Sequence, residues 1–278
     1  TKAAAESPLD LEMSVTYDFD RYKLAQPLID AVHEGTVKET DIDEKVRHIL
    51  LLMFRLKMLD AAENLERKAG CYNTPEHHNM IRKAAEESVV LLKNDKQRLP
   101  LDPKKTKKLL VIGDNAERLH SCGGGSAEIK ALYEISPLLG IKELLGGNAQ
   151  VAYARGYYVS PKEEQETNWQ ENSLDENFDA DAHMNERGMF SEEVLAEQKK
   201  LRDEAVTLAA QYEQVIVVAG LNHDFDVEGF ARSDITLLYN QDQLIEEVLS
   251  VNPNAIVVMM AGNAVSMGRW KDRAKAIV

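Results

Sequence analysis

The second half of the chain alternates short apolar runs with longer amphipathic stretches. The runs are rich in β-branched residues, which is typical of strands buried on both faces of a parallel sheet. They are KLLVIG (108–113), QVAYARG (150–156), QVIVVAG (214–220) and AIVVMMAG (255–262), and KAIV (275–278) resembles a fifth that is cut short. The stretches between them predict helices at 136–146, 191–213 and 240–252, with Ser191 as the N-cap of the middle one. This half is therefore predicted to be an α/β body.

The first part of the chain instead shows the 3.6-residue period of amphipathic helices. One helix is predicted to end at Gly35, a residue suited to a helix C-terminus. A second, with one apolar stripe, is predicted to begin at a capping box formed by Thr40 and Asp43. A third is predicted to run from Thr74, as its N-cap, to about Lys93. The chain thus consists of a helical head and an α/β body, with a boundary between residues 65 and 107.

A long polar insert interrupts this pattern at residues 160–190, where nine acidic residues outnumber two basic ones. Such a segment is a surface loop. It is either a solvated excursion or a flap over a ligand site, and the sequence leaves both interpretations open.

Composition narrows the function classes. The net charge of −14 argues against nucleic acid as a partner, because no basic face is present to meet phosphates. No apolar run approaches the roughly 18 residues of a membrane span, and the N-terminus lacks a secretion pattern, so we expect a cytoplasmic protein without a membrane partner. The two cysteines, Cys71 and Cys122, have no metal-binding spacing and are expected to be free thiols.

Candidate chemistry lies in two loops that follow predicted strands, where ligands bind to open parallel sheets. The first contains GGGS (123–126), which lacks the Lys-Ser/Thr pair of a phosphate-binding P-loop. The second is DFDVEGFARSD (224–234), in which Phe225 and Phe230 flank Glu228. A glutamate between apolar rings has a raised pKa and can donate a proton near neutral pH. A solvated acidic loop remains the alternative.

The other reactive residue types do not form a recognisable site. His77 and His78 are adjacent and cannot both face one metal ion, and His120 and His223 are treated as single residues. No metal site is therefore expected. The nucleophile elbow GxSxG of serine hydrolases does not occur in the sequence.

Seven ordered stretches together resemble glycoside hydrolase family 3, the β-glucosidase family. LDLEM (9–13) is similar to the family's GLDLEMP, and DIDEKVRHIL (41–50) to IDEAVRRIL. AAEESVVLLKND before LPL (84–101), LLVIGDNA (109–116) and GGGSA (123–127) resemble AAEESIVLLKNE…LPL, IAVIGPNA and GGGSA. VVAGLNHDFDVEGFARSD (217–234) resembles VVVGLNEEWESEGFDRPD, and NPNAIVVMM (252–260) resembles NPNTVVVLN.

The resemblance implies the last helices of a (β/α)8-like barrel followed by a mostly parallel α/β sandwich domain. The predicted divisions are residues 1–66 for the barrel remnant and the start of a linker, 67–107 for the linker and leading helix, and 108–278 for the sandwich domain. The family continues into further motifs beyond the last residue of this sequence, so the sandwich domain is expected to be incomplete at its C-terminus.

The resemblance also implies a retaining β-glycosidase that needs no cofactor. In that chemistry one carboxylate attacks the anomeric carbon while a second acts as acid and then as base. Glu228 matches the acid/base, while Gly124, Gly125, Ser126 and Arg232 match the substrate-binding positions. The family's nucleophile, an aspartate in a Ser-Asp-Trp segment, is expected upstream of LDLEM. That segment does not occur here, and Asp10 of LDLEM is not its equivalent.

Further expectations follow from the missing nucleophile. The isolated chain is expected to be inactive. Its expected partners are a terminal β-glycoside or oligosaccharide substrate and the barrel domain of the same polypeptide, while a homo-oligomer is left open.

Three stretches depart from the family pattern: AGLDLEMP has become ESPLDLEMS, GPNA has become GDNA at Asp114, and GFDR has become GFAR at Ala231. The last change removes a carboxylate beside the proposed acid, so the substrate specificity is expected to differ. One alternative function is an inactive carbohydrate-binding or scaffold module of the same fold. A nucleotide-binding domain, a third hypothesis, would need a phosphate loop at 113–125, where the glycine spacing is poor.

Overall fold

The computed structural model describes residues 1–13, 20, 22–60, 70–121, 131–158, 190–223, 232 and 234–278. The chain divides into two compact units, residues Thr1–Ile81 and Arg82–Val278. Within the described residues, no helix has the length and apolar character needed to cross a membrane. Cys71 is exposed and has a free thiol.

The first unit is helical. Helices α1 (Lys2–Glu6), α2 (Gln26–His33) and α3 (Glu39–Arg55) surround a small apolar core. Its buried members are Ala5, Leu28, Ala31 and Val37. As predicted, α2 is followed by Gly35, which adopts the left-handed conformation that glycine favours, with φ of +71°. Helix α4 (Pro75–Ser88) begins in this unit, and the Thr74 hydroxyl accepts a hydrogen bond from the His77 amide at 3.3 Å, which confirms the predicted cap.

Two predictions about helix ends are wrong. Helix α3 begins at Glu39 with Lys38 as its N-cap and no capping side chain, so the proposed Thr40–Asp43 box does not form. Its first turn instead carries Glu39 and Asp41, whose charges favour the positive end of the helix dipole. Helix α4 ends at Ser88 rather than near Lys93, because the chain from there enters the sheet.

The second unit is an α/β domain built on one six-stranded sheet. Its strands are β1 (Lys93–Asn94), β2 (Lys108–Ile112), β3 (Gln150–Ala154), β4 (Gln214–Gly220), β5 (Ile256–Met260) and β6 (Ala276–Ile277). Their spatial order is β1-β6-β5-β4-β2-β3, and every neighbouring pair is parallel except β1 with β6. The five runs seen in the sequence are confirmed as strands, whereas the short antiparallel β1 was not predicted.

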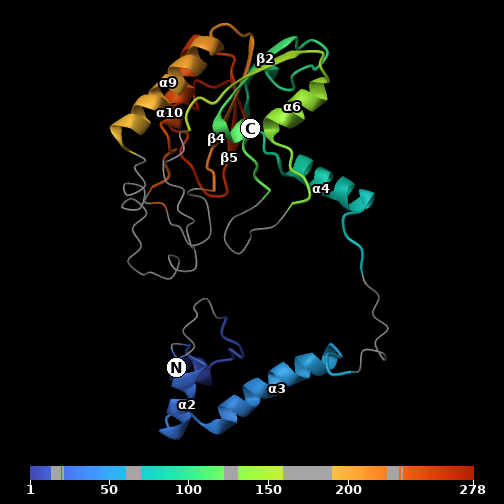
Figure 1. Ribbon diagram of the computed structural model, residues 1–278, viewed down its shortest axis with the longest axis vertical. Coiled ribbons are helices and arrows are strands. Elements are labelled where there is room, and N and C mark those ends of the chain that lie inside the picture. The colour runs from blue at the N-terminus through green and yellow to red at the C-terminus, as the bar shows by residue number, and fades with distance from the viewer. Residues whose placement is uncertain are drawn as a thin grey trace. The chain divides into compact units, whose positions relative to one another are not determined.

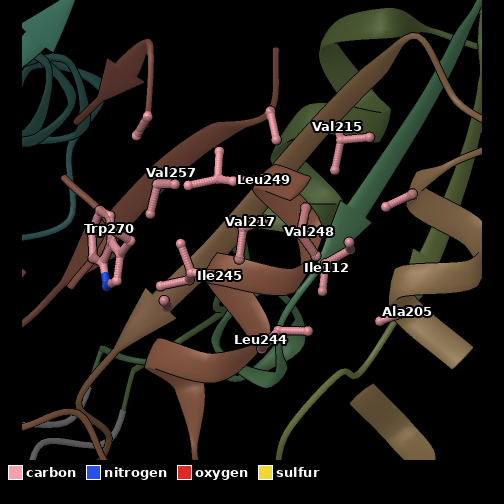
Figure 2. Close-up of a cluster of buried hydrophobic side chains, with 14 of the residues drawn as sticks. Ile112, Ala205, Val215, Val217, Leu244, Ile245, Val248, Leu249, Val257 and Trp270 are labelled. Atoms are coloured by element: carbon pink, nitrogen blue, oxygen red, sulfur yellow. The ribbon is translucent and has the colours of Figure 1, made fainter. Parts of the chain in front are cut away.

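Helices cover both faces of this sheet, which explains why its strands are continuously apolar. On one face, α9 (Glu192–Ala209) and α10 (Gln241–Val251) lie side by side, as Figure 1 shows. Their buried side chains pack on alternate residues of the strands. Figure 2 shows Leu244, Ile245 and Val248 of α10 beside Val217 and the other strand side chains of this core. On the opposite face lie α5 (Asp114–Glu117) and α6 (Pro137–Leu145).

The long helix α9 begins where the sequence predicted. The Ser191 hydroxyl accepts a hydrogen bond from the Val194 amide at 3.3 Å, so Ser191 is confirmed as its N-cap. Ser136 caps α6 in the same way, through the Leu139 amide. A single-turn 3-10 helix (Asp95–Gln97) connects β1 to the loop before β2.

Candidate active site

The two loops singled out in the sequence leave the same edge of the sheet. Strands β2 and β4 are parallel neighbours, with Ile112 opposite Val217, so their carboxyl ends lie side by side. The segment after β2 leads towards the glycine loop, and the segment after β4 leads towards the acidic loop. This is the edge at which open parallel sheets bind ligands.

Glycine is required where the chain leaves each strand. Gly113, directly after β2, has φ of +121°, and a Cβ atom there would lie 1.9 Å from the carbonyl oxygen of Val218. Gly220, the last residue of β4, has φ of +127°, and a Cβ atom would lie 1.9 Å from the carbonyl oxygen of Met260. Both exits therefore depend on a residue without a side chain.

Most of the sequence-predicted site residues fall outside the described residues. Gly124, Gly125 and Ser126 lie in the segment 122–130, and Glu228 lies in the segment 224–231. The departure at Ala231 and nearly all of the acidic insert are outside as well. Their assigned roles stay predictions, and the structure describes the framework from which the two loops leave.

Two histidines join the starts of these loops. The rings of His120 and His223 meet edge to face, with centroids 5.8 Å apart and an interplanar angle of 82°. Treating these histidines as single residues was therefore wrong, because the parallel pairing of β2 and β4 brings them together. Burial, followed by the neighbouring His223, lowers the pKa of His120, which favours its neutral form. No group of three or more His, Cys, Asp or Glu side chains in the described ranges could hold a metal ion.

Asp114, at the position where the family motif has proline, is the centre of a charged cluster. Its carboxylate lies 2.8 Å from Nε of Arg118 and 3.7 Å from Nε of Arg155. The guanidinium of Arg118 also lies over the ring of Tyr158, 4.4 Å from its centroid, in a cation–π geometry. Asp114 thus ties the start of α5 to the residue that follows β3.

Asn115 links the exits of the two strands. It is fully buried, and its side-chain amide donates to the carbonyl of Leu221 at 2.9 Å. Its own main-chain N–H donates to the hydroxyl of Tyr157 at 3.0 Å. The first residues after β2 and after β4 are therefore held together by a hydrogen bond that water cannot reach.

Gln241 performs a similar function for β4 alone. This fully buried residue of α10 donates through Nε2 to the carbonyl of Gly220, and its Oε1 accepts from the amide of Gly220, both at 2.8 Å. One side chain therefore satisfies both polar groups of the glycine that ends the strand. Its role could not be predicted from the sequence, since an isolated Gln at a helix start gives no distinctive pattern.

Arg232 is the only predicted site residue within the described ranges. Its guanidinium donates to the carbonyl of Ala264 at 2.7 Å and to that of Thr236 at 3.4 Å. Nearby, Asp234 accepts from the amide and hydroxyl of Thr236, and these hydrogen bonds lower the pKa of Asp234. Arg232 thus connects the end of the acidic loop to the segment after β5. Its predicted contact with substrate stays a prediction.

Comparison with known proteins connects this framework to one family. The profile of the Glycosyl hydrolase family 3 C-terminal domain matches residues 89–278. The chain is 33% identical to a β-glucosidase of Bacteroides ovatus, over 100% of this chain and 35% of that protein. It is 30% identical to thermostable β-glucosidase B of Acetivibrio thermocellus, over 98% of this chain and 30% of that protein. The chain thus spans about a third of the length of these relatives.

Solved structures show the same fold. A β-glucosidase from Erythrobacter marinus matches with a TM-score of 0.66 at 25% identity, over 90% of this chain and 32% of the other. The β-glucosidase DesR from Streptomyces venezuelae, solved in complex with D-glucose, matches with a TM-score of 0.72 at 20% identity. That match covers 99% of this chain and 44% of the other. On the strength of the domain profile and the relatives that match along its whole length, the chain belongs to glycoside hydrolase family 3.

Proposed function

We propose that this chain is part of a retaining β-glycosidase, of the β-glucosidase kind, that removes terminal non-reducing β-D-glycosyl residues. In this proposal Glu228 is the general acid/base, and Ser126, with Gly124 and Gly125, contacts the sugar. Arg232 supports the acidic loop and borders the substrate. The nucleophile, an aspartate, is supplied by the barrel domain upstream of LDLEM. The names of the relatives support the reaction class.

The observation that carries the proposal is the shared exit of the two loops. Both leave the carboxyl edge of adjacent parallel strands, and Asn115 and the His120–His223 contact join their starts. An acid/base on one loop and a hydroxyl on the other can then act on one bound sugar. Because a retaining enzyme protonates the departing oxygen, the acid matters most when that oxygen leaves poorly.

The experiment compares leaving groups in the whole enzyme that contains this chain. Glu228→Ala should lower kcat/KM for an alkyl β-glucoside or cellobiose by about 100- to 10,000-fold. The loss on 2,4-dinitrophenyl β-glucoside should be much smaller, since that leaving group needs no proton. Asp226→Ala, which removes a carboxylate two positions away, serves as the matched control and should change neither substrate's rate substantially. Equal losses on both substrates for Glu228→Ala would contradict the assigned role.

The same experiment separates the enzyme from an inactive binding module of the same fold. A module would bind glucose, as measured by calorimetry, without hydrolysing any aryl glycoside even with the barrel domain present. Turnover by the unmodified whole enzyme excludes that alternative.

A further inference from the structure

Helix α3 buries a lysine, whereas several of its apolar side chains are exposed. Lys45 is 7% exposed and is the only buried residue among the 17 of this helix. Apolar residues of the same helix are open to solvent by contrast, with Val46 at 47%, Leu50 at 41% and Phe54 at 63% exposed. Burying an ammonium group costs free energy unless its hydrogens are satisfied, so the partners of Lys45 are informative.

The partners of Lys45 are main-chain carbonyls of one segment. Its Nζ atom donates to the carbonyl of Ser7 at 2.8 Å and to that of Leu9 at 2.6 Å. No ion pair joins Lys45 to a carboxylate in the part of the chain that the structure describes. The amine therefore holds the course of the backbone just before and within LDLEM, independently of the side chains there.

Two further contacts fix the same segment. The Nδ1 atom of His48, one turn along α3, lies 3.0 Å from Oδ1 and 3.1 Å from Oδ2 of Asp10. The carboxylate of Glu12 accepts a hydrogen bond from the main-chain amide of Leu24 at 2.7 Å. The segment from Ser7 to Glu12 is thus contacted from outside by Lys45, by His48 and by the main chain at Leu24.

We propose that Lys45 is a positioning residue for the glycosidase reaction, because it fixes the backbone of Ser7–Leu9 and thereby the chain that leads back to the nucleophile. This inference rests on the proposed function, in which the nucleophile precedes LDLEM. Lys45 does not touch the substrate. It acts through the segment that it holds, and a displacement of about 1 Å at a reacting group can cost about 100-fold in rate.

The test measures attack by the nucleophile alone, in the whole enzyme that contains this chain. An activated 2-deoxy-2-fluoro-β-glucoside forms a covalent glycosyl-enzyme that hydrolyses slowly, so its inactivation rate reports the first displacement. Lys45→Met should lower the second-order inactivation rate by about 10- to 100-fold. Lys45→Arg, which keeps the charge and the donors, should restore part of that loss. Lys38→Met, at the exposed N-cap of the same helix, is the matched control and should leave the rate unchanged.

The melting temperature is measured in parallel to separate positioning from stability. If Lys45→Met is folded and inactivated within twofold of the wild-type rate, the inference is wrong. If Lys45→Met does not fold, Lys45→Gln replaces it under the same criterion. If the wild-type enzyme hydrolyses glycosides and the folded Lys45 variant is inactivated within twofold of its rate, only the inference about Lys45 is wrong. The proposed function then stands. A wild-type enzyme that neither turns over nor is labelled overturns both.

Discussion

At the residue scale, individual polar side chains hold the chain in place where it leaves β2 and β4. Asn115 joins the two exits, Gln241 satisfies both polar groups of Gly220, and His120 contacts His223. None of these contacts could be predicted from the sequence, because each connects residues that are far apart along the chain. The sequence motifs identify the residues, such as Glu228, that resemble catalytic ones, whereas the residues that support them become visible only once the strands are paired.

The first prediction concerns His120 and pH. Its folded-state pKa lies below the unfolded value of about 6.5, because burial disfavours the charged form. The unfolded chain therefore binds the proton more readily. The stability that His120 contributes is fully present above about pH 6.5 and is lost as the pH falls through the lower folded-state pKa.

Replacing His120 by phenylalanine keeps a ring but removes the titration. The free energy of unfolding of the α/β unit should then fall less between pH 7 and pH 5 than it does in the wild type. Urea unfolding at a series of pH values, followed by tryptophan fluorescence, measures this slope. His33→Phe, an exposed histidine of α2, is the control. A slope for His120→Phe that equals the wild-type slope would argue against a depressed pKa.

At the scale of elements, the sequence pattern predicts those strands and helix caps that depend on residues near one another in the chain. The continuous apolar runs become β2 to β6, because both faces of the sheet are covered by helices. The serine cap of α9 is likewise a contact between residues near in sequence. The predicted end of α4 fails for the opposite reason, since Lys93 and Asn94 pair with Ile277 and Ala276 at the other end of the chain. Distant pairing overrides helical propensity there.

The second prediction concerns the end of β4. Gly220→Ala places a Cβ atom 1.9 Å from the carbonyl oxygen of Met260 and forces a side chain into φ of +127°. It should destabilise the α/β unit by at least about 3 kcal/mol, through backbone strain and the displacement of β5. Urea unfolding gives this value. Gly268→Ala is the control, because the nearest atom to its Cβ is the Ser266 hydroxyl at 3.6 Å, and its effect should stay within about 0.5 kcal/mol. Similar effects for both variants would contradict the close-approach argument.

At the scale of the whole molecule, the two units of the chain have different roles in the proposed function. The α/β unit contains the loops of Ser126 and Glu228, and the helical unit contains the LDLEM segment held by Lys45. The chain spans about a third of the length of its relatives, so activity is a property of the longer polypeptide in this proposal. The ordered motifs predicted a part of a longer polypeptide, whereas the physical pattern alone indicated only a helical head and an α/β body.

The most direct test of the central claim is azide rescue of Glu228→Ala in the whole enzyme. Once the acid/base is removed, the glycosyl-enzyme formed from 2,4-dinitrophenyl β-glucoside is hydrolysed slowly, because no general base activates the attacking water. Azide needs no base, so it should raise turnover at least about tenfold and give β-glucosyl azide, with the configuration retained after two displacements. Unchanged turnover with azide and no glucosyl azide, in a variant that the dinitrophenyl substrate shows to be folded and active, would contradict the assignment of Glu228.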